Sequence, residues 1–186
     1  IYSVSTDETR YHLNGVYFER TPGSKAHEYL MVATDGHRLS LVNQIKADQQ
    51  GQTEGVIIPR KGLSEIYKLL EGSDETFKMA IEGSQLIVIS KNTVLMVRLI
   101  EGKYPNYRQL IPQNLSQTVK VGREQLLSSL KRVSLLSNQK SKGVTLNFND
   151  GKLEITSNNP ELGDAKEEIP VDYSGKELKI GFNAKY

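Results

Sequence analysis

The feature that most constrains this fold is an internal repeat of short structural patterns. Residues 57–63 have the pattern of a strand that runs into a helix, and residues 120–126 repeat it. A hairpin pattern at 81–86 recurs at 148–153. A short amphipathic unit must bury its apolar side against a neighbour, so repetition predicts several similar units packed together.

A longer repeat relates the two ends of the chain. Gly15-Val16 corresponds to Gly143-Val144, and residues 30–34 correspond to 153–157 at nearly the same separation. The repeating unit is expected to be a helix packed on a small antiparallel sheet. We therefore predict an α+β fold in which this unit is used more than once per domain and again in the next domain.

Short apolar or alternating runs, separated by turn residues, predict the strands. The strands are expected at 1–4, 15–19, 28–33, 38–42, 56–58, 77–81, 86–89, 93–100 and 118–121. Residues 21–24 and 43–54 lack such a pattern and are expected to be loops.

Two stretches have helical periodicity. The first begins at Pro59 and ends before Gly72, and the second spans residues 123–136. The positions expected to face inward are Leu63, Ile66, Tyr67, Leu70, Leu126, Leu127, Leu130 and Val133. The basic residues that lie off these apolar stripes are Arg60, Lys61, Lys68, Arg123, Lys131 and Arg132.

Composition excludes several classes of protein. The chain has no cysteine, which removes disulfide frameworks, thiolate metal sites and thiol nucleophiles. Its 24 basic and 22 acidic residues nearly balance, so any attraction to nucleic acid must come from a local patch. No apolar run approaches the ~20 residues that span a bilayer. These observations predict a soluble, cytoplasmic protein without a membrane segment.

The stretch with the most chemistry follows the apolar run of residues 29–33. Asp35-Gly36 is a dipeptide that readily turns a strand back, and Leu39 resumes an extended pattern. The simplest interpretation is a hairpin turn. Asp35 and His37 could also form part of a metal site or an acid–base pair, but no further catalytic motif accompanies them. A metal-dependent hydrolase and a protein-interaction scaffold without a DNA role remain alternatives.

Residues 33–39, Ala-Thr-Asp-Gly-His-Arg-Leu, resemble a signature of the middle domain of the bacterial DNA polymerase III beta subunit, the sliding clamp. Five further stretches resemble clamp motifs in the same order, at 10–16, 58–62, 101–107, 136–138 and 181–186. The resemblance implies that residues 1–112 are the middle domain without its N-terminal part. Residues 113–186 would then be the first part of the third domain.

The resemblance also implies an architecture and a function. Clamp domains carry antiparallel sheets outside and helices on the inner face, and two full-length chains close into a ring around duplex DNA. A clamp is a non-catalytic processivity factor that needs no cofactor and no metal. The implied partners are double-stranded DNA of any sequence, a second copy of the full-length chain, the polymerase III catalytic subunit, the clamp loader and other polymerases. The polymerases and the clamp loader would bind through short linear motifs.

Two sets of site residues follow from the resemblance. The DNA-binding set is Arg10, Tyr11, Arg60 and Lys61, and His12 stands where the family often has a second tyrosine. From charge alone, the basic helix residues are more simply explained as solvated faces. The set for the peptide-binding cleft is Leu13, Thr34, Gly36, His37, Arg38, Leu39, Pro105, Leu110, Asn183 and Tyr186. Gln109 and Ser141 depart from the residues that the family usually has there.

Overall fold

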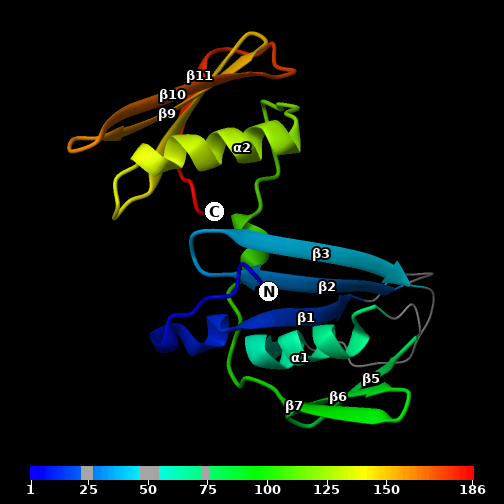
Figure 1. The fold of residues 1–186 in the computed structure, drawn as a ribbon. Coiled ribbons are helices and arrows are strands. Elements are labelled where there is room, and N and C mark those ends of the chain that lie inside the picture. The colour runs from blue at the N-terminus through cyan, green and yellow to red at the C-terminus, as the bar shows by residue number, and fades with distance from the viewer. Residues whose placement is uncertain (22–26, 47–54, 73–75) are drawn as a thin grey trace. The chain divides into compact units, whose positions relative to one another are not determined.

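The computed structural model describes residues 1–21, 27–46, 55–72 and 76–186 (Figure 1). The described chain divides into two compact units, unit 1 (Ile1–Ile111) and unit 2 (Pro112–Tyr186). Most of the loop expected at 21–24 and most of the loop expected at 43–54 lie outside the described residues, whereas Thr21 ends β1 and residues 43–46 belong to β3. Each unit is described below by itself.

Unit 1 is strand-rich and has one α-helix among its described residues. Its elements are η1 (Glu8–Leu13), β1 (Gly15–Thr21), β2 (His27–Thr34), β3 (Leu39–Lys46), β4 (Val56–Pro59), α1 (Arg60–Leu70), β5 (Lys78–Glu82), β6 (Gln85–Ser90), β7 (Thr93–Arg98) and η2 (Tyr107–Leu110). The elements of unit 2 are α2 (Arg123–Val133), η3 (Ser134–Leu136), β8 (Gly143–Asn149), β9 (Lys152–Asn159), β10 (Gly163–Pro170) and β11 (Leu178–Asn183).

The four-stranded sheets of the two units have the same topology. Their strand orders are β3-β2-β1-β4 and β10-β9-β8-β11, and every neighbouring pair is antiparallel. Gly15 opens β1 as Gly143 opens β8, so the longer repeat that the sequence predicts is confirmed. The predicted α+β class is confirmed with it.

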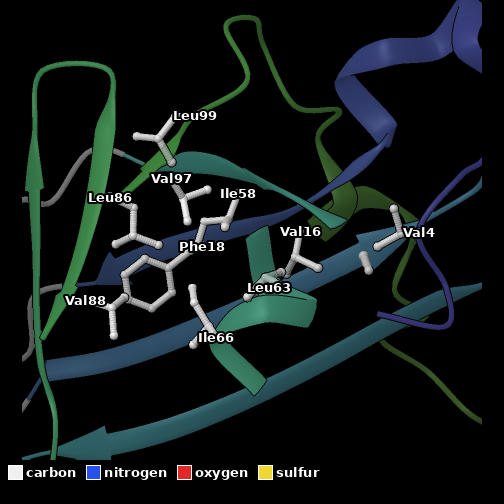
Figure 2. Packing of buried hydrophobic residues seen from close by; sticks show 11 residues of the cluster. Val4, Val16, Phe18, Ile58, Leu63, Ile66, Leu86, Val88, Val97 and Leu99 are labelled. Carbon is white, nitrogen blue, oxygen red and sulfur yellow. The ribbon is translucent and has the colours of Figure 1, made fainter. Parts of the chain in front are cut away.

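One face of the sheet in unit 1 packs on α1 and on the three-stranded sheet β5-β6-β7. Phe18 and Ile58 from the first sheet meet Leu63 of α1 and Leu86 and Val97 of the second sheet in one buried cluster (Figure 2). The ribbon shows α1 lying between β1 and the β5-β6-β7 sheet (Figure 1). The predicted helix at this position therefore has its apolar stripe between two sheets.

The opposite face of this sheet is covered by the segment 101–111, which we call the strap. Tyr104 and Tyr107 of the strap are buried against Leu13, Val32 and Ile57. The strap is held by polar contacts as well as by burial, and these are described with the site. The sheet therefore has apolar side chains on both faces.

In unit 2, α2 packs on one face of the β8–β11 sheet (Figure 1). Val133 of α2 is buried with Leu153 and Ile155 of β9. The Ser157 hydroxyl also donates a 2.7 Å hydrogen bond to the Val133 carbonyl oxygen. That bond satisfies one of the carbonyls that every helix end leaves without an intrahelical partner.

Two predicted strands do not form, and a third is longer than predicted. Residues 1–4 form a turn, closed by a 3.1 Å bond from the Val4 N–H to the Ile1 carbonyl, because two alternating apolar residues do not suffice for a strand without a pairing partner. β3 continues to Lys46, because pairing with β2 extends it past its apolar part. The segment 118–121 pairs only through a single bridge between Lys120 and Asp172.

The predicted helix faces need two corrections. Tyr67 is 61% exposed and Leu127 is 37% exposed, because both lie at the margin of an apolar stripe rather than within it. α2 ends at Val133, and the last residues of the predicted helix form the tighter turn η3. Gly72 follows α1 with a φ of +72°, as expected for a residue that ends a helix. None of the described helices is long and apolar enough to cross a membrane.

Candidate functional site

Arg60 and Lys61 begin α1 and are both exposed. No side chain caps this helix, and no acidic residue lies in its first turn. The Arg60 N–H donates a 3.1 Å bond to the Asn14 carbonyl, which ties the start of α1 to the start of β1. A helix N-terminus that carries two cations and no carboxylate favours a phosphate group.

Arg10 and Tyr11 lie in η1, and their surroundings differ. Tyr11 is 57% exposed. The Arg10 guanidinium donates from Nε to Asp7 Oδ2 at 2.9 Å and from Nη1 to the Asp35 carbonyl oxygen at 3.1 Å. Arg10 is therefore engaged by protein groups, although the sequence predicted it as a DNA contact.

The basic residues of the two helices are not equivalent. Lys131 and Arg123 are exposed, but Arg123 pairs with Glu124, and Lys68 pairs with Glu65 at 3.0 Å. Arg132 donates to both carboxylate oxygens of Glu167, with Nη2 at 2.6 Å from Oε2. That bond, followed by one from Ser129, lowers the pKa of Glu167 to about 2. Arg132 thus reaches toward β10, although its position off the apolar stripe predicted a solvated side chain.

The turn between β2 and β3 is held by its own side chains. Asp35 Oδ1 accepts from the N–H groups of His37 at 2.9 Å and Arg38 at 3.0 Å. Asp35 Oδ2 accepts from Arg38 Nε at 3.2 Å. The Thr34 hydroxyl accepts from the Gly36 N–H at 3.1 Å and donates to the Arg38 carbonyl at 2.7 Å. Gly36 has a φ of +88°, which residues with a Cβ rarely adopt.

This hydrogen bonding argues against a metal or acid–base role for Asp35. Both of its carboxylate oxygens accept bonds within the turn. Burial raises the pKa of Asp35, but the bonds from His37 and Arg38 outweigh it, and the net pKa is lowered. The described residues include no group of three or more side chains that could hold a metal ion. The hydrolase alternative has no support.

Six of the predicted cleft residues lie in or beside this turn. Leu13 and Leu39 belong to the cluster under the strap, and Thr34 is buried. The Thr34 N–H donates a 3.1 Å bond to the Tyr104 hydroxyl, so the strap touches the turn directly. Gly36 and Arg38 complete this group, and His37 is exposed beside it.

The remaining predicted cleft residues lie in the strap and in unit 2. Pro105 is half-buried and Leu110 is 63% exposed. In unit 2, Asn183 Nδ2 donates to the Ser141 carbonyl at 3.0 Å, and Asn183 Oδ1 accepts from the Lys185 N–H at 2.9 Å. Tyr186 is 56% exposed. The Asn183 amide therefore shapes the end of β11, and its predicted contact with a peptide stays a prediction.

Several residues that hold this region together have no signal in the local sequence. The buried Glu19 of β1 accepts hydrogen bonds from the Tyr107 hydroxyl and from Arg108, which fastens the strap. Burial and then the Glu19 carboxylate raise the pKa of Tyr107. The backbone carbonyl of Tyr2 accepts a 2.6 Å bond from Arg38 Nη2. These contacts join residues far apart in the chain, so no local pattern signals them.

Comparison with known proteins places the chain in a family. Residues 1–106 match the family model of the DNA polymerase III beta subunit, central domain, and residues 108–186 match that of its C-terminal domain. The chain belongs to the DNA polymerase III beta subunit family.

Relatives and solved structures agree with this membership. The chain is 40% identical over 185 residues to the beta sliding clamp of Haemophilus influenzae and 35% identical to that of Escherichia coli K12, covering 100% of this chain and 49% of each relative. It resembles the sliding clamp of Bartonella birtlesii bound to griselimycin with a TM-score of 0.93 and 34% identity, covering 100% of this chain and 50% of that one. For the beta subunit of Pseudomonas aeruginosa the TM-score is 0.91 at 33% identity, covering 99% and 50%. The predicted clamp fold is confirmed, and the chain spans about half the length of these relatives.

The lowered pKa of Asp35 predicts how the turn responds to acid. Because the folded-state pKa lies below the unfolded value of about 3.9, the ionised carboxylate stabilises the fold above that value, and this contribution is lost as the pH falls through the folded-state pKa. We expect the amide NMR signals of Gly36, His37 and Arg38 to hold steady at neutral pH and to shift only as the pH falls through the lowered pKa of Asp35. In Asp35→Asn they should show no such titration. An identical acid transition in that variant would contradict the assignment.

Proposed function

We propose that this chain is part of a DNA sliding clamp, a non-catalytic subunit that keeps a replicative polymerase on duplex DNA. Membership in the beta subunit family carries the proposal. The uncapped, carboxylate-free start of α1 supports the DNA role, because Arg60 and Lys61 offer positive charge to phosphates, and phosphate contacts carry no sequence information. Contacts of this kind tolerate movement along DNA of any sequence.

The domain assignment is also a proposal. Residues 1–112 act as the middle domain and 113–186 as the first part of the third domain of a longer subunit. The match of two successive family models supports this, as does the recurrence of one sheet topology. Two full-length subunits form the closed ring, and they act in the cytoplasm.

A second part of the proposal concerns partner proteins. The Asp35–Leu39 turn forms one wall of a cleft that takes short linear motifs of the polymerase III catalytic subunit, the clamp loader and other polymerases. Its chemistry suits a peptide: Leu39 and Pro105 are apolar, Gly36 admits a close backbone, and His37 and Arg38 supply directional polar groups.

The interaction-scaffold alternative differs from the clamp in its DNA affinity. We expect the protein to bind duplex DNA with a dissociation constant on the order of 10⁻⁴ to 10⁻⁶ M. The affinity should fall steeply as the salt concentration rises and should hardly change with the DNA sequence. Lys61→Ala should lower the slope of log affinity against log salt by about 1.

The matched control for this measurement is Lys179→Ala. Lys179 is exposed on β11 and pairs with Asn147, on the sheet face opposite α2. Lys179→Ala makes the same charge change on a sheet face that does not carry a helix, and the salt slope should stay as in the wild type. Fluorescence anisotropy with two duplexes of unrelated sequence measures both variants. A strong preference for one duplex, or equal slopes in wild type and Lys61→Ala, would refute the DNA role.

The cleft assignment is tested at His37 and Leu39. His37→Ala should weaken binding of a Gln-Leu-containing pentapeptide while leaving the free energy of unfolding nearly unchanged, because His37 is exposed. Leu39→Ala should weaken binding and also destabilise the fold, by less than the ~2–5 kcal/mol of a fully buried leucine. Peptide titration and urea unfolding measure the two effects. Leu162→Ala, at an exposed leucine of unit 2, is the control, and unchanged peptide affinity at His37 and Leu39 would remove the cleft.

A further inference from the structure

Arg10 has surroundings unlike those of the other cations in the proposed DNA-binding set. Its side chain is 41% exposed, and it forms an ion pair with Asp7, whose side chain is 40% exposed. Asp7 Oδ1 also accepts from the Thr9 hydroxyl at 2.6 Å and the Thr9 N–H at 3.0 Å. The Thr9 bonds, followed by the bond from Arg10, lower the pKa of Asp7. Asp7 is thus an ionised anchor fixed to the start of η1.

The second contact of Arg10 reaches the cleft turn. Arg10 Nη1 donates to the Asp35 carbonyl oxygen, 25 residues away in the chain. A Cβ placed on Gly36 would lie 2.8 Å from the same nitrogen, so the guanidinium rests against the most constrained residue of the turn. Arg10 therefore bridges η1 and the backbone of the turn that presents His37 and Arg38.

Electrostatics separates Arg10 from Arg60 and Lys61. Asp7 and Glu8 lie beside Arg10 in η1, whereas the first turn of α1 has no acidic residue. Asp7 and Asp35 already engage two of the five N–H donors of Arg10. A phosphate there would also have to approach the carboxylates of Asp7 and Glu8. A phosphate at Arg60 or Lys61 meets no such opposition, so the favourable counterion release of DNA binding should come from α1.

We propose that Arg10 is a positioning residue for the Asp35–Leu39 turn and is not a phosphate ligand. It holds the Asp35 carbonyl and the Gly36 backbone in the shape that a bound motif peptide requires, and Asp7 holds Arg10. The proposal rests on the proposed function for the identity of the peptide ligand. The restraint that Arg10 places on the turn does not depend on that function. The positioning role replaces the expectation that Arg10 contacts DNA.

Three variants test this assignment. Arg10→Ala removes both contacts. Arg10→Lys keeps the positive charge, which a phosphate contact needs, but a single ammonium lacks the planar fork that reaches Asp7 and the Asp35 carbonyl together. Thr9→Ala is the matched control, because it removes a hydrogen bond to the same carboxylate of Asp7 and leaves both contacts of Arg10 in place.

The readouts are the amide NMR signals of Gly36, His37 and Arg38, the affinity for a Gln-Leu-containing pentapeptide, and the salt slope for a short DNA duplex. In Arg10→Ala and Arg10→Lys alike, we expect the turn amides to shift and exchange faster and peptide affinity to fall about tenfold, the loss of one charged hydrogen bond. The DNA salt slope should equal that of the wild type. Thr9→Ala should behave as the wild type in all three.

The opposite pattern would overturn the proposal. If Arg10→Ala lowers the salt slope by about 1 while Arg10→Lys restores it, Arg10 is a phosphate ligand. Unchanged turn amides in Arg10→Ala would equally refute a positioning role. A wild-type protein that binds neither DNA nor peptide would refute the proposed function alone, because the turn amides would still report whether Arg10 holds the turn.

Discussion

Burial of the β3-β2-β1-β4 sheet on both faces is the constraint on which the rest of unit 1 depends. α1 and the β5-β6-β7 sheet cover one face, and the strap covers the other. A shift in register by one residue would exchange the two sets of side chains, so double burial fixes the alignment of the strands. The turn that joins β2 and β3 is fixed in consequence.

Register then explains why the candidate residues gather. Gly15 pairs with Pro59, and Thr34 pairs with Leu39, at the end of the sheet where β1 begins and β2 ends. η1, the Asp35–Leu39 turn and the start of α1 therefore lie at the same end of the sheet. This arrangement puts the cations proposed for DNA and the turn proposed for peptides close to each other within one unit.

The cations at this end of the sheet are of two kinds. Arg60 and Lys61 stand at a helix start without carboxylates, where charge remains available to a phosphate. Arg10 and Arg38 donate hydrogen bonds to the carboxylates of Asp7 and Asp35 and to backbone carbonyls. Counting basic residues would treat the four alike. The four cations differ in their hydrogen-bond partners. In unit 2, Arg132 likewise has a protein partner, because it forms an ion pair with Glu167.

The sequence predicts whatever is encoded locally or by repetition. Asp35-Gly36 carries its own turn chemistry, and the repeat predicts two similar sheets because the same pattern must bury the same faces. Prediction from the sequence fails where a residue far away in the chain determines the contact. No pattern shows that Arg10 meets Asp35 or that Glu19 fastens the strap, and residues 118–121 have a strand-like pattern but find only one bridge. Tyr67 is misassigned because a helical period cannot tell the margin of a stripe from its centre.

We propose that DNA is held by topology, with weak phosphate contacts from α1. Retention of the full-length protein on nicked circular DNA, after loading by its clamp loader, tests it most directly. The protein should remain on the circle through gel filtration at a salt concentration that abolishes its binding to short duplexes, and it should be released when the circle is cut once. Loss from the intact circle at that salt concentration, or retention after cutting, would contradict the account.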